Sequence, residues 1–389
     1  MNPFKELFLL DPDIIYLNHG SFGACPRAVF EVFQDWQRQL EYQPVDFIGR
    51  RLTGLLAEAR ARLSEYLGVT TDEVVYFQNP TTAINMVARS LSLKPGDEIL
   101  ATDHEYGSLD RTWNFVCQKS GAKYIRYPIP LPLSNVPDFI EAFWSGVNER
   151  TKVIFISHIT SPTALIFPIA EICQKARQAG ILSIVDGAHA PGQIIINLPA
   201  IGADIYTGAC HKWLCAPKGS AFLFARREIQ TMLEPLVISW GFQSKHPGPS
   251  QFIDYHEVQG TRDVAAFLSV PKAIELLSQP DWVAARQDRH NLACQTRQRI
   301  SELTHLDPIS PLVDNTLAQE HTWFGLMFVA RLPNNCDLEY LKRRLYDDFH
   351  IEVPLTLWND QKLIRTSFQV YNSEEDADRL LEALSIILR

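Results

Sequence analysis

Between residues 73 and 225, apolar runs of strand length alternate with segments that carry apolar residues at helical spacing, and this alternation strongly constrains the fold. The expected strands span residues 73–78, 98–102, 123–127, 152–158, 181–185, 203–206 and 220–224. The expected helices span residues 79–93, 108–119, 137–148 and 169–179. Strands separated by helices of this length need right-handed crossovers. The pattern therefore predicts an α/β fold in which a mainly parallel seven-stranded sheet lies between helices.

The pattern changes on both sides of this region. After Gly260, expected helices and strands follow at 264–277, 282–303, 323–330, 338–348, 363–367 and from 373 onward, which indicates a smaller α+β domain. The N-terminal segment, with a short strand running into a loop at 14–26 and a helix at 27–42, is expected to join it. A helix at 51–67, capped by Gly68, belongs to the large domain. We expect a large domain over 45–262 and a smaller one from 1–44 and 263–389.

The composition bounds the class of protein. With 389 residues, 46% hydrophobic and 21% charged, the chain can build two domains and a large core. A net charge of −9 without any run of lysine or arginine argues against a nucleic-acid partner. The first residues predict neither a signal peptide nor a membrane span, so we expect a cytoplasmic protein without a membrane partner. Seven scattered cysteines without a Cys-x-x-Cys pair predict neither a disulfide framework nor a metal site.

Lys212 stands out within the stretch Asp204–Gly219. It lies between two strand-like apolar runs, with few polar neighbours to solvate an ammonium group. A desolvated lysine has a lowered pKa and can act as a nucleophilic amine, as Schiff-base lysines do. The stretch alone is equally compatible with an ordinary lysine at a strand end.

Other polar groups follow the expected strands of the same sheet. Asn79-Pro-Thr-Thr82 offers hydroxyls and free amides at a helix N-terminus, which suits a phosphate, although Thr81 or Thr82 could simply cap the helix. Asp186 follows an apolar strand, where a carboxylate needs a cationic or hydrogen-bonding partner; a structural ion pair is the alternative. His104 and Tyr106 follow another strand. Ligands bind at the carboxyl ends of such strands. Together, a phosphate cradle, a carboxylate, an aromatic ring and a desolvated lysine are what pyridoxal 5′-phosphate requires.

Several separated motifs resemble the class V aminotransferase family of fold-type I pyridoxal-phosphate enzymes, and most of all its isopenicillin N epimerase-like branch. The motifs span almost the whole chain, in the order Tyr16–Gly23, Asp186–His189, His211–Gly219, Gly260–Asp263 and Arg365–Asn372. Two positions depart from the family pattern: Ser161-Pro-Thr163 stands where many relatives have an asparagine near the ring oxygen, and Ala209 replaces a small polar residue. Residues 350–359 also lack the cysteine that desulfurases carry there, which argues against persulfide-forming activity.

The resemblance implies a role for each candidate cofactor residue. Lys212 would bind the cofactor as a Schiff base and move the α-proton, and Asp186 would pair with the ring nitrogen. His189 and Ser161 would lie near the ring oxygen, and Tyr106, or less readily His104, would stack on the ring. The phosphate would be held by Thr81, Thr82 and His211, and by Thr261 across a homodimer interface.

The resemblance also implies how a substrate binds. Arg365 would grip the α-carboxylate of an amino acid, a bidentate contact suited to a planar guanidinium, and the alternative is a surface ion pair. Asn18 and His19 would lie beside the substrate, and His19 or Tyr106 could supply a second acid.

The implied function is a homodimeric pyridoxal-phosphate enzyme that acts at the α-carbon of an amino acid, with catalytic residues Lys212, Asp186 and Tyr106. Epimerisation like that of isopenicillin N epimerases is the main interpretation, and a cysteine or C–S lyase or an aminotransferase is the alternative within the family. A non-catalytic binding protein with this fold is the alternative from another class. A nucleotide-binding oxidoreductase is disfavoured, because no Gly-x-Gly-x-x-Gly motif follows a first strand.

Overall fold

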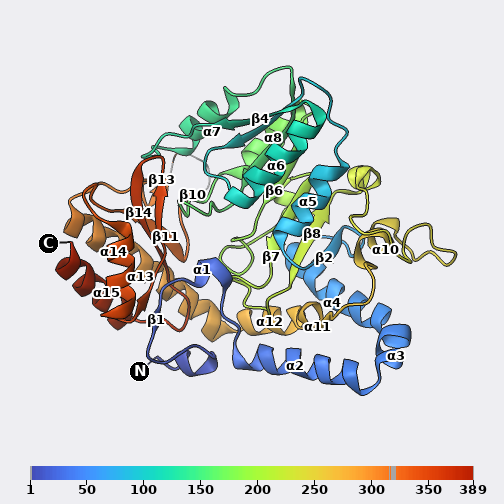
Figure 1. The fold of residues 1–389 in the computed structure, drawn as a ribbon, viewed down its shortest axis with the longest axis horizontal. Coiled ribbons are helices and arrows are strands. Elements are labelled where there is room, and N and C mark those ends of the chain that lie inside the picture. Colours follow the sequence, from blue (N-terminus) through green and yellow to red (C-terminus); the bar gives the residue numbers. More distant parts are fainter. Residues whose placement is uncertain (1, 315, 317–320, 389) are drawn as a thin grey trace.

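The computed structural model describes residues 2–314, 316 and 321–388, and a seven-stranded sheet lies at its centre (Figure 1). Its strands are β2 (Val74–Phe77), β3 (Glu98–Thr102), β4 (Lys123–Tyr127), β5 (Thr151–Ser157), β6 (Leu182–Asp186), β7 (Ile205–Ala209) and β8 (Ala221–Ala225). In the order β2-β8-β7-β6-β5-β3-β4, neighbouring strands are parallel, except that β8 is antiparallel to β7 and β2. The predicted mainly parallel sheet is confirmed.

Helices cover both faces of this sheet. Successive side chains of a strand point to opposite faces, so Val74 and Tyr76 enter one core while Val75 and Phe77 enter another. The first core also receives residues of α4 (Leu52–Leu67), α7 (Val136–Trp144), α8 (Ile169–Gln178) and α12 (Val270–Leu277). The second receives residues of α5 (Pro80–Ser90) and α6 (Gly107–Ser120). Burial on both faces explains why these strands read as nearly continuous apolar runs.

A smaller unit lies to one side, coloured orange to red in Figure 1. Its antiparallel sheet has the order β11-β14-β13, and its elements are β11 (Met327–Arg331), β13 (Leu355–Trp358), β14 (Gln361–Ser367), α13 (Pro280–Thr304), α14 (Leu338–Asp347) and α15 (Glu374–Ile387). These elements share a core with Leu17. The N-terminal segment reaches this unit because β1 (Ile15–Tyr16) pairs in parallel with β12 (Ile351–Glu352). The domain boundaries at 44/45 and 262/263 stay a prediction.

Several local details differ from the sequence predictions. The helix expected at 264–277 is divided at Ser269 into α11 (Ala265–Leu268) and α12, because Pro271 near the start of α12 cannot continue a preceding helix. The expected loop at 14–26 contains a helical turn, α1 (His19–Phe22). The strand expected at 323–330 begins only at Met327.

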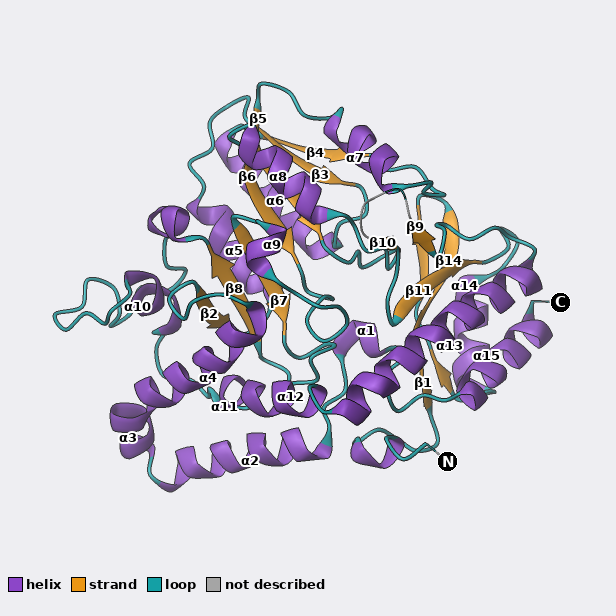
Figure 2. Ribbon diagram, turned by 180° about the vertical axis from the view of Figure 1, so that it is seen from behind, coloured by secondary structure: helices purple, strands orange, loops and turns teal. Residues whose placement is uncertain are grey.

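Figure 2 shows the remaining α-helices and strands. They are α2 (Arg27–Tyr42), α3 (Pro44–Asp46), α9 (Leu198–Ile201), α10 (Gln251–Glu257), β9 (Val313–Asp314) and β10 (His321–Thr322). Within the described ranges, no helix combines the length and the apolar character needed to cross a membrane.

Candidate active site

A pocket of about 170 Å³ opens at the carboxyl ends of the parallel strands. Its walls come from α1, the start of α5, the segment between β3 and α6, the ends of β5 and β6, and the segment after β7. The lining residues include Ser21, Phe22, Asn79, Thr81, Tyr106, Ser157, Ser161, Asp186, His189, His211 and Lys212. Seven of the predicted site residues (Thr81, Tyr106, Ser161, Asp186, His189, His211 and Lys212) therefore line one pocket, at the edge where parallel α/β sheets bind ligands.

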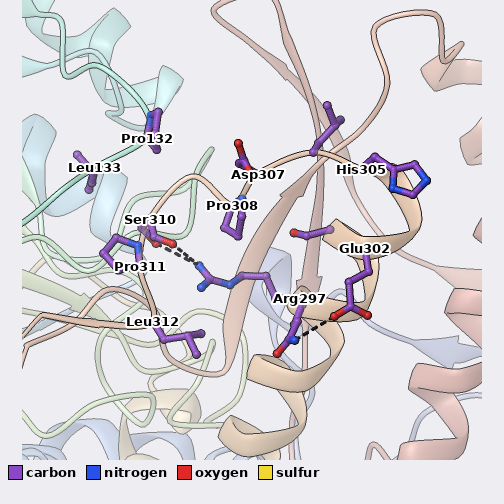
Figure 3. Close-up of a pocket in the computed structure, with 13 residues that line it drawn as sticks. Pro132, Leu133, Arg297, Glu302, His305, Asp307, Pro308, Ser310, Pro311 and Leu312 are labelled. Carbon is purple, nitrogen blue, oxygen red and sulfur yellow. Dashed lines mark hydrogen bonds between the residues drawn. The ribbon is translucent and has the colours of Figure 1, made fainter.

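A larger surface cavity, of about 790 Å³, lies beside the C-terminal end of α13 (Figure 3). Its buried Arg297 donates hydrogen bonds to the carbonyl and hydroxyl oxygens of Ser310, at 3.1 and 3.2 Å. None of the predicted site residues lines this cavity. The smaller pocket is therefore the candidate active site.

Lys212 follows β7 and lines the pocket, where it is only partly exposed. The pKa of its amine is lowered to about 8, mainly by burial; Asp186 opposes the shift, and the charge of Arg365 contributes to it. An ordinary lysine at a strand end, the alternative considered from sequence, would not have a pKa lowered in this way. A substantial fraction of neutral, nucleophilic amine is therefore present near neutral pH.

Covalent labelling of Lys212 is expected to follow this pKa. Because only the neutral amine attacks an aldehyde, the labelling rate should rise as the pH passes through about 8 and then level off. Exposed lysines keep gaining reactivity to a pH of about 10.4. The rates can be measured on protein stripped of cofactor by adding pyridoxal phosphate, reducing with borohydride and mapping the labelled peptides. A rate at Lys212 that still climbs above pH 10 would contradict the lowered pKa.

His189 faces the Lys212 amine, with 3.2 Å between its Nε2 and Lys212 Nζ. Its other nitrogen, Nδ1, lies 3.4 Å from the indole nitrogen of Trp213. An indole N–H can only donate, so Nδ1 accepts and the ring proton is on Nε2. Burial, with the charges of Lys212 and Arg365, lowers the pKa of His189 well below its ordinary value. The neutral ring of His189 therefore directs its Nε2–H toward the Lys212 amine.

Asp186 ends β6 and is buried at the pocket. Burial raises the pKa of this carboxyl, while the backbone N–H of Ala188, which donates to Oδ1 at 2.9 Å, and the charge of Lys212 lower it. Among the described residues it forms no ion pair within 4 Å, so the structural ion pair considered from sequence is not found. A buried carboxylate without a counterion fits the protonated ring nitrogen of pyridoxal phosphate.

The start of α5 forms the opposite end of the pocket. Asn79 caps this helix, because its Oδ1 accepts from the backbone N–H of Thr82 at 2.8 Å and from the Thr82 hydroxyl at 3.1 Å. Thr81 lines the pocket, whereas Thr82 lines a neighbouring hollow. His211 also lines the pocket and shares a 3.0 Å hydrogen bond between its Nδ1 and the carbonyl of Ser220. Asn79 takes up the Thr82 N–H, whereas Thr81 remains available at the pocket wall for a phosphate.

The two aromatic candidates after β3 have different surroundings. Tyr106 lines the pocket and is 45% exposed, so its ring is accessible to a ligand. His104 is buried outside the pocket, where its ring nitrogens bond Thr163 Oγ1 at 2.7 Å and the carbonyl of Ile129 at 3.1 Å. Of the two, Tyr106 is the one positioned to contact a cofactor.

The remaining candidates lie around the pocket rather than in its wall. His19 is fully buried and bonds the Tyr371 hydroxyl and the Lys212 carbonyl, both at 3.0 Å. Burial lowers its pKa to about 3, so it supports the backbone of Lys212 as a neutral ring. Thr261 is exposed outside the pocket, and its expected contact would lie across a dimer interface. Asn18 contacts the pocket residue Ser21, whose hydroxyl donates to its Oδ1 at 2.5 Å.

Eight of the lining residues were not predicted to be site residues: Ser21, Phe22, Asn79, Pro80, Leu109, Ser157, Ile159 and Ala188. Ser21 and Phe22 fall inside the motif Tyr16–Gly23, and Asn79 opens the motif at the start of α5, so their motifs were the available signal. Ser157 ends β5, at the edge where the pocket was expected.

Because Gly23 has no side chain, the N-terminal segment can contact the backbone of His211 and Lys212. Its φ is +69°, and a Cβ there would lie 2.0 Å from the His211 carbonyl oxygen and 2.9 Å from the Lys212 Cα. No side chain fits this approach without moving the lysine segment.

Gly23→Ala is therefore expected to lower the free energy of unfolding by about 2–4 kcal/mol, through the left-handed backbone and the overlap. Urea denaturation measures this change. Gly54→Ala is the matched control, because it lies within α4 and a Cβ there meets nothing within 4 Å. The control should gain about 0.5–1 kcal/mol. Equal stabilities of the two variants would show that the close approach is wrong.

Arg365 lies on β14 beside the pocket and is 7% exposed. Its Nη1 donates to the Ser161 carbonyl at 2.6 Å and its Nη2 to the Ser21 hydroxyl at 2.9 Å, whereas Nε has no partner in the described part of the chain. Burial lowers its pKa to about 10. No described carboxylate pairs with it, so the surface ion pair considered from sequence is not found.

Known proteins resemble this chain along most of its length. Residues 15–326 match the family described as Aminotransferase class-V. The isopenicillin N epimerase of Amycolatopsis lactamdurans is 35% identical over 98% of this chain and 96% of its own length. The probable chloroplastic L-cysteine desulfhydrase of Arabidopsis thaliana is 26% identical over 97% of this chain and 84% of its own length.

A solved structure confirms the fold-type I architecture. It is a C-DES mutant with glycine covalently linked to the PLP cofactor, and it matches with a TM-score of 0.81 and 19% identity over 97% of both chains. The chain belongs to the class-V aminotransferase family and is a pyridoxal-phosphate-dependent enzyme.

Proposed function

We propose that this enzyme acts at the α-carbon of an amino acid that carries a free α-carboxylate, and that it epimerises a substrate of the kind named for its isopenicillin N epimerase relatives. One observation carries the proposal: a lysine and a buried carboxylate line a single pocket, and the buried guanidinium of Arg365 bonds two further residues of its wall. Neither Asp186 nor Arg365 has a described ionic partner. Asp186 is thus available to the ring nitrogen of the cofactor, and Arg365 to the α-carboxylate of the amino acid.

When bound, pyridoxal phosphate supplies a ring that accepts electrons from the substrate α-carbon. Lys212 holds the cofactor and then moves the α-proton; a pKa of about 8 suits a base near neutral pH. Asp186 keeps the proton on the ring nitrogen. Tyr106 covers the ring, and its hydroxyl is a candidate acid for the opposite face of the α-carbon.

Thr81, the first turn of α5 and His211 hold the phosphate in this proposal, and Thr82 supports that turn through Asn79. Neutral His189 donates its Nε2–H to the ring oxygen, and Ser161 flanks the same side of the pocket. Arg365 orients the α-carboxylate through its donors that remain free.

A C–S lyase is the second candidate, because the Arabidopsis thaliana relative is named an L-cysteine desulfhydrase. Persulfide formation in the manner of desulfurases is disfavoured, since residues 350–359 contain no cysteine. Transamination shares the same early proton transfer and stays an alternative.

Incubation of the holoenzyme with a panel of L- and D-amino acids in deuterated water tests these outcomes. Deuterium at the α-carbon with inversion supports epimerisation, and release of pyruvate and ammonia from cysteine supports a lyase. A keto acid together with pyridoxamine phosphate supports transamination. Absence of α-exchange and of keto acid with every substrate would refute action at the α-carbon.

A homodimer in which Thr261 contacts the phosphate of the neighbouring site is part of this proposal. Exposed apolar side chains on the preceding segment support it: Leu236, Val237, Ile238 and Trp240. Light scattering of the purified protein tests the assembly. A cytoplasmic location stays a prediction of the sequence.

A further inference from the structure

A chain of hydrogen bonds connects Arg365 to a distant carboxylate. Arg365 Nη2 donates to Ser21 Oγ at 2.9 Å, Ser21 Oγ donates to Asn18 Oδ1 at 2.5 Å, and Asn18 Nδ2 donates to Glu352 Oε1 at 2.9 Å. The contacts therefore link a cation to an anion through two neutral side chains.

Chemistry fixes the direction of every bond in this chain. A guanidinium has only donors, so Ser21 must accept from Arg365 and keeps its own proton for Asn18. A carboxylate has only acceptors, so Asn18 turns its NH₂ group to Glu352 and its carbonyl to Ser21. The two charged ends thus determine the serine rotor and the asparagine amide orientation, which leaves one arrangement.

The backbone brings these side chains together from separate elements. Tyr16 pairs with Glu352 across β1 and β12, and the Leu17 N–H donates to the Glu352 carbonyl at 2.9 Å. Asn18 and Ser21 follow directly, at the start of α1. On the other side of the guanidinium, the Ser161 carbonyl accepts from Nη1. Arg365 is held from two sides, yet keeps free donors.

Ser21 and Asn18 separate the carboxylate of Glu352 from Arg365, and this separation has a chemical consequence. A glutamate in direct contact with Arg365 would neutralise it and compete with an incoming carboxylate. In the observed arrangement, the negative charge of Glu352 orients Asn18 and Ser21, while the guanidinium has no ion pair among the described residues. Arg365 is therefore fixed in place without losing its charge to an internal partner.

We propose that Glu352, Asn18 and Ser21 are positioning residues that hold Arg365 for the α-carboxylate of the substrate. The inference rests on the proposed function, in which Arg365 binds that carboxylate.

The test compares two probes, glycine and methylamine, which differ by the carboxylate alone. Each is titrated into the holoenzyme, and its affinity is read from the visible spectrum of the cofactor. Ser21→Ala and Asn18→Ala should weaken glycine binding about tenfold or more, because a hydrogen bond linked to a charged group is lost. Methylamine binding should change less than about twofold, since it has no carboxylate to place.

Conservative variants separate positioning from general damage. Ser21→Thr keeps the hydroxyl and should regain most of the glycine affinity, and Glu352→Gln should lose less than Asn18→Ala because its amide oxygen still accepts from Asn18. Ser385→Ala, at a half-buried serine on α15, is the matched control and should bind both probes as the wild type does. Thermal unfolding verifies that each variant is folded. If Asn18→Ala does not fold, the affinities of Ser21→Ala test the positioning role.

Two outcomes would overturn the proposal. Unchanged glycine affinity in Ser21→Ala would show that Arg365 needs no support, and equal losses for glycine and methylamine would show that the residues act on the cofactor instead. Arg365→Lys separates this test from the proposed function. If Arg365→Lys and Ser21→Ala both lose glycine affinity selectively, while no amino acid shows α-exchange, the relay stands and the proposed reaction fails.

Discussion

Lys212→Ala is expected to lower α-proton exchange about 10³-fold or more, because the variant loses both the amine that holds the cofactor and the base that moves the proton. Lys212 is the lysine that lines the pocket, and its amine has a pKa lowered by burial to about 8. Borohydride reduction of the holoenzyme should therefore leave no cofactor attached to the variant. The exchange is measured by NMR in deuterated water.

Lys218→Ala is the matched control for this change. Lys218 lies on the same segment but is exposed, does not line the pocket, and donates to the carbonyl of Gly23 at 3.0 Å. Its variant should retain covalent cofactor and exchange. If Lys212→Ala kept exchange within tenfold of the wild type, the assignment of Lys212 would be wrong.

Asp186→Asn is expected to reduce α-proton exchange by about 10²–10³-fold, the usual effect of removing one preorganised electrostatic group. Asparagine preserves the shape but cannot hold a proton on the ring nitrogen by charge. The native carboxyl is buried and has no described ionic partner, so the loss is not compensated by a neighbour. A pH titration of the visible spectrum should show that the cofactor ring loses its proton at lower pH in the variant.

Asp204→Asn distinguishes this effect from the loss of any buried acid. Asp204 is buried beside the same sheet, accepts from the backbone N–H of Ser183 at 2.8 Å and pairs with Arg226 at 2.8 Å, away from the pocket. Its variant should unfold at lower urea concentration and keep the normal spectrum. Identical spectra for both variants would contradict a role for Asp186 at the ring nitrogen.

The sequence by itself predicted the central sheet well, because its signals are local. Val74–Phe77 is apolar throughout, and Leu182–Asp186 is interrupted only by Ser183 before it ends at Asp186. Each run is bounded by a turn or a helix, which specifies strands buried on both faces. Lys212, Asp186 and Thr81 could be proposed together because each follows a strand, and such strand ends share an edge. Whether a residue follows a strand can be seen from its position in the sequence alone.

Local signals were weaker outside that sheet. The short strands β12 and β13 were not predicted, because runs of two and four residues carry little periodicity. The division of the helix at Ser269 depended on Pro271, a local signal that the apolar pattern obscured.

Only the tertiary structure decided which side chains enter the pocket and which support it. His104 and Tyr106 are two positions apart, yet one bonds Thr163 away from the pocket and the other lines it. Asn18 bonds Glu352 across 334 positions, and Ser21 bonds Arg365 across 344. Periodicity encodes which face of a strand or helix is buried, whereas contacts over such separations depend on how completed elements pack. The sequence therefore determined the fold and the cofactor, and packing determined how the substrate arginine is held.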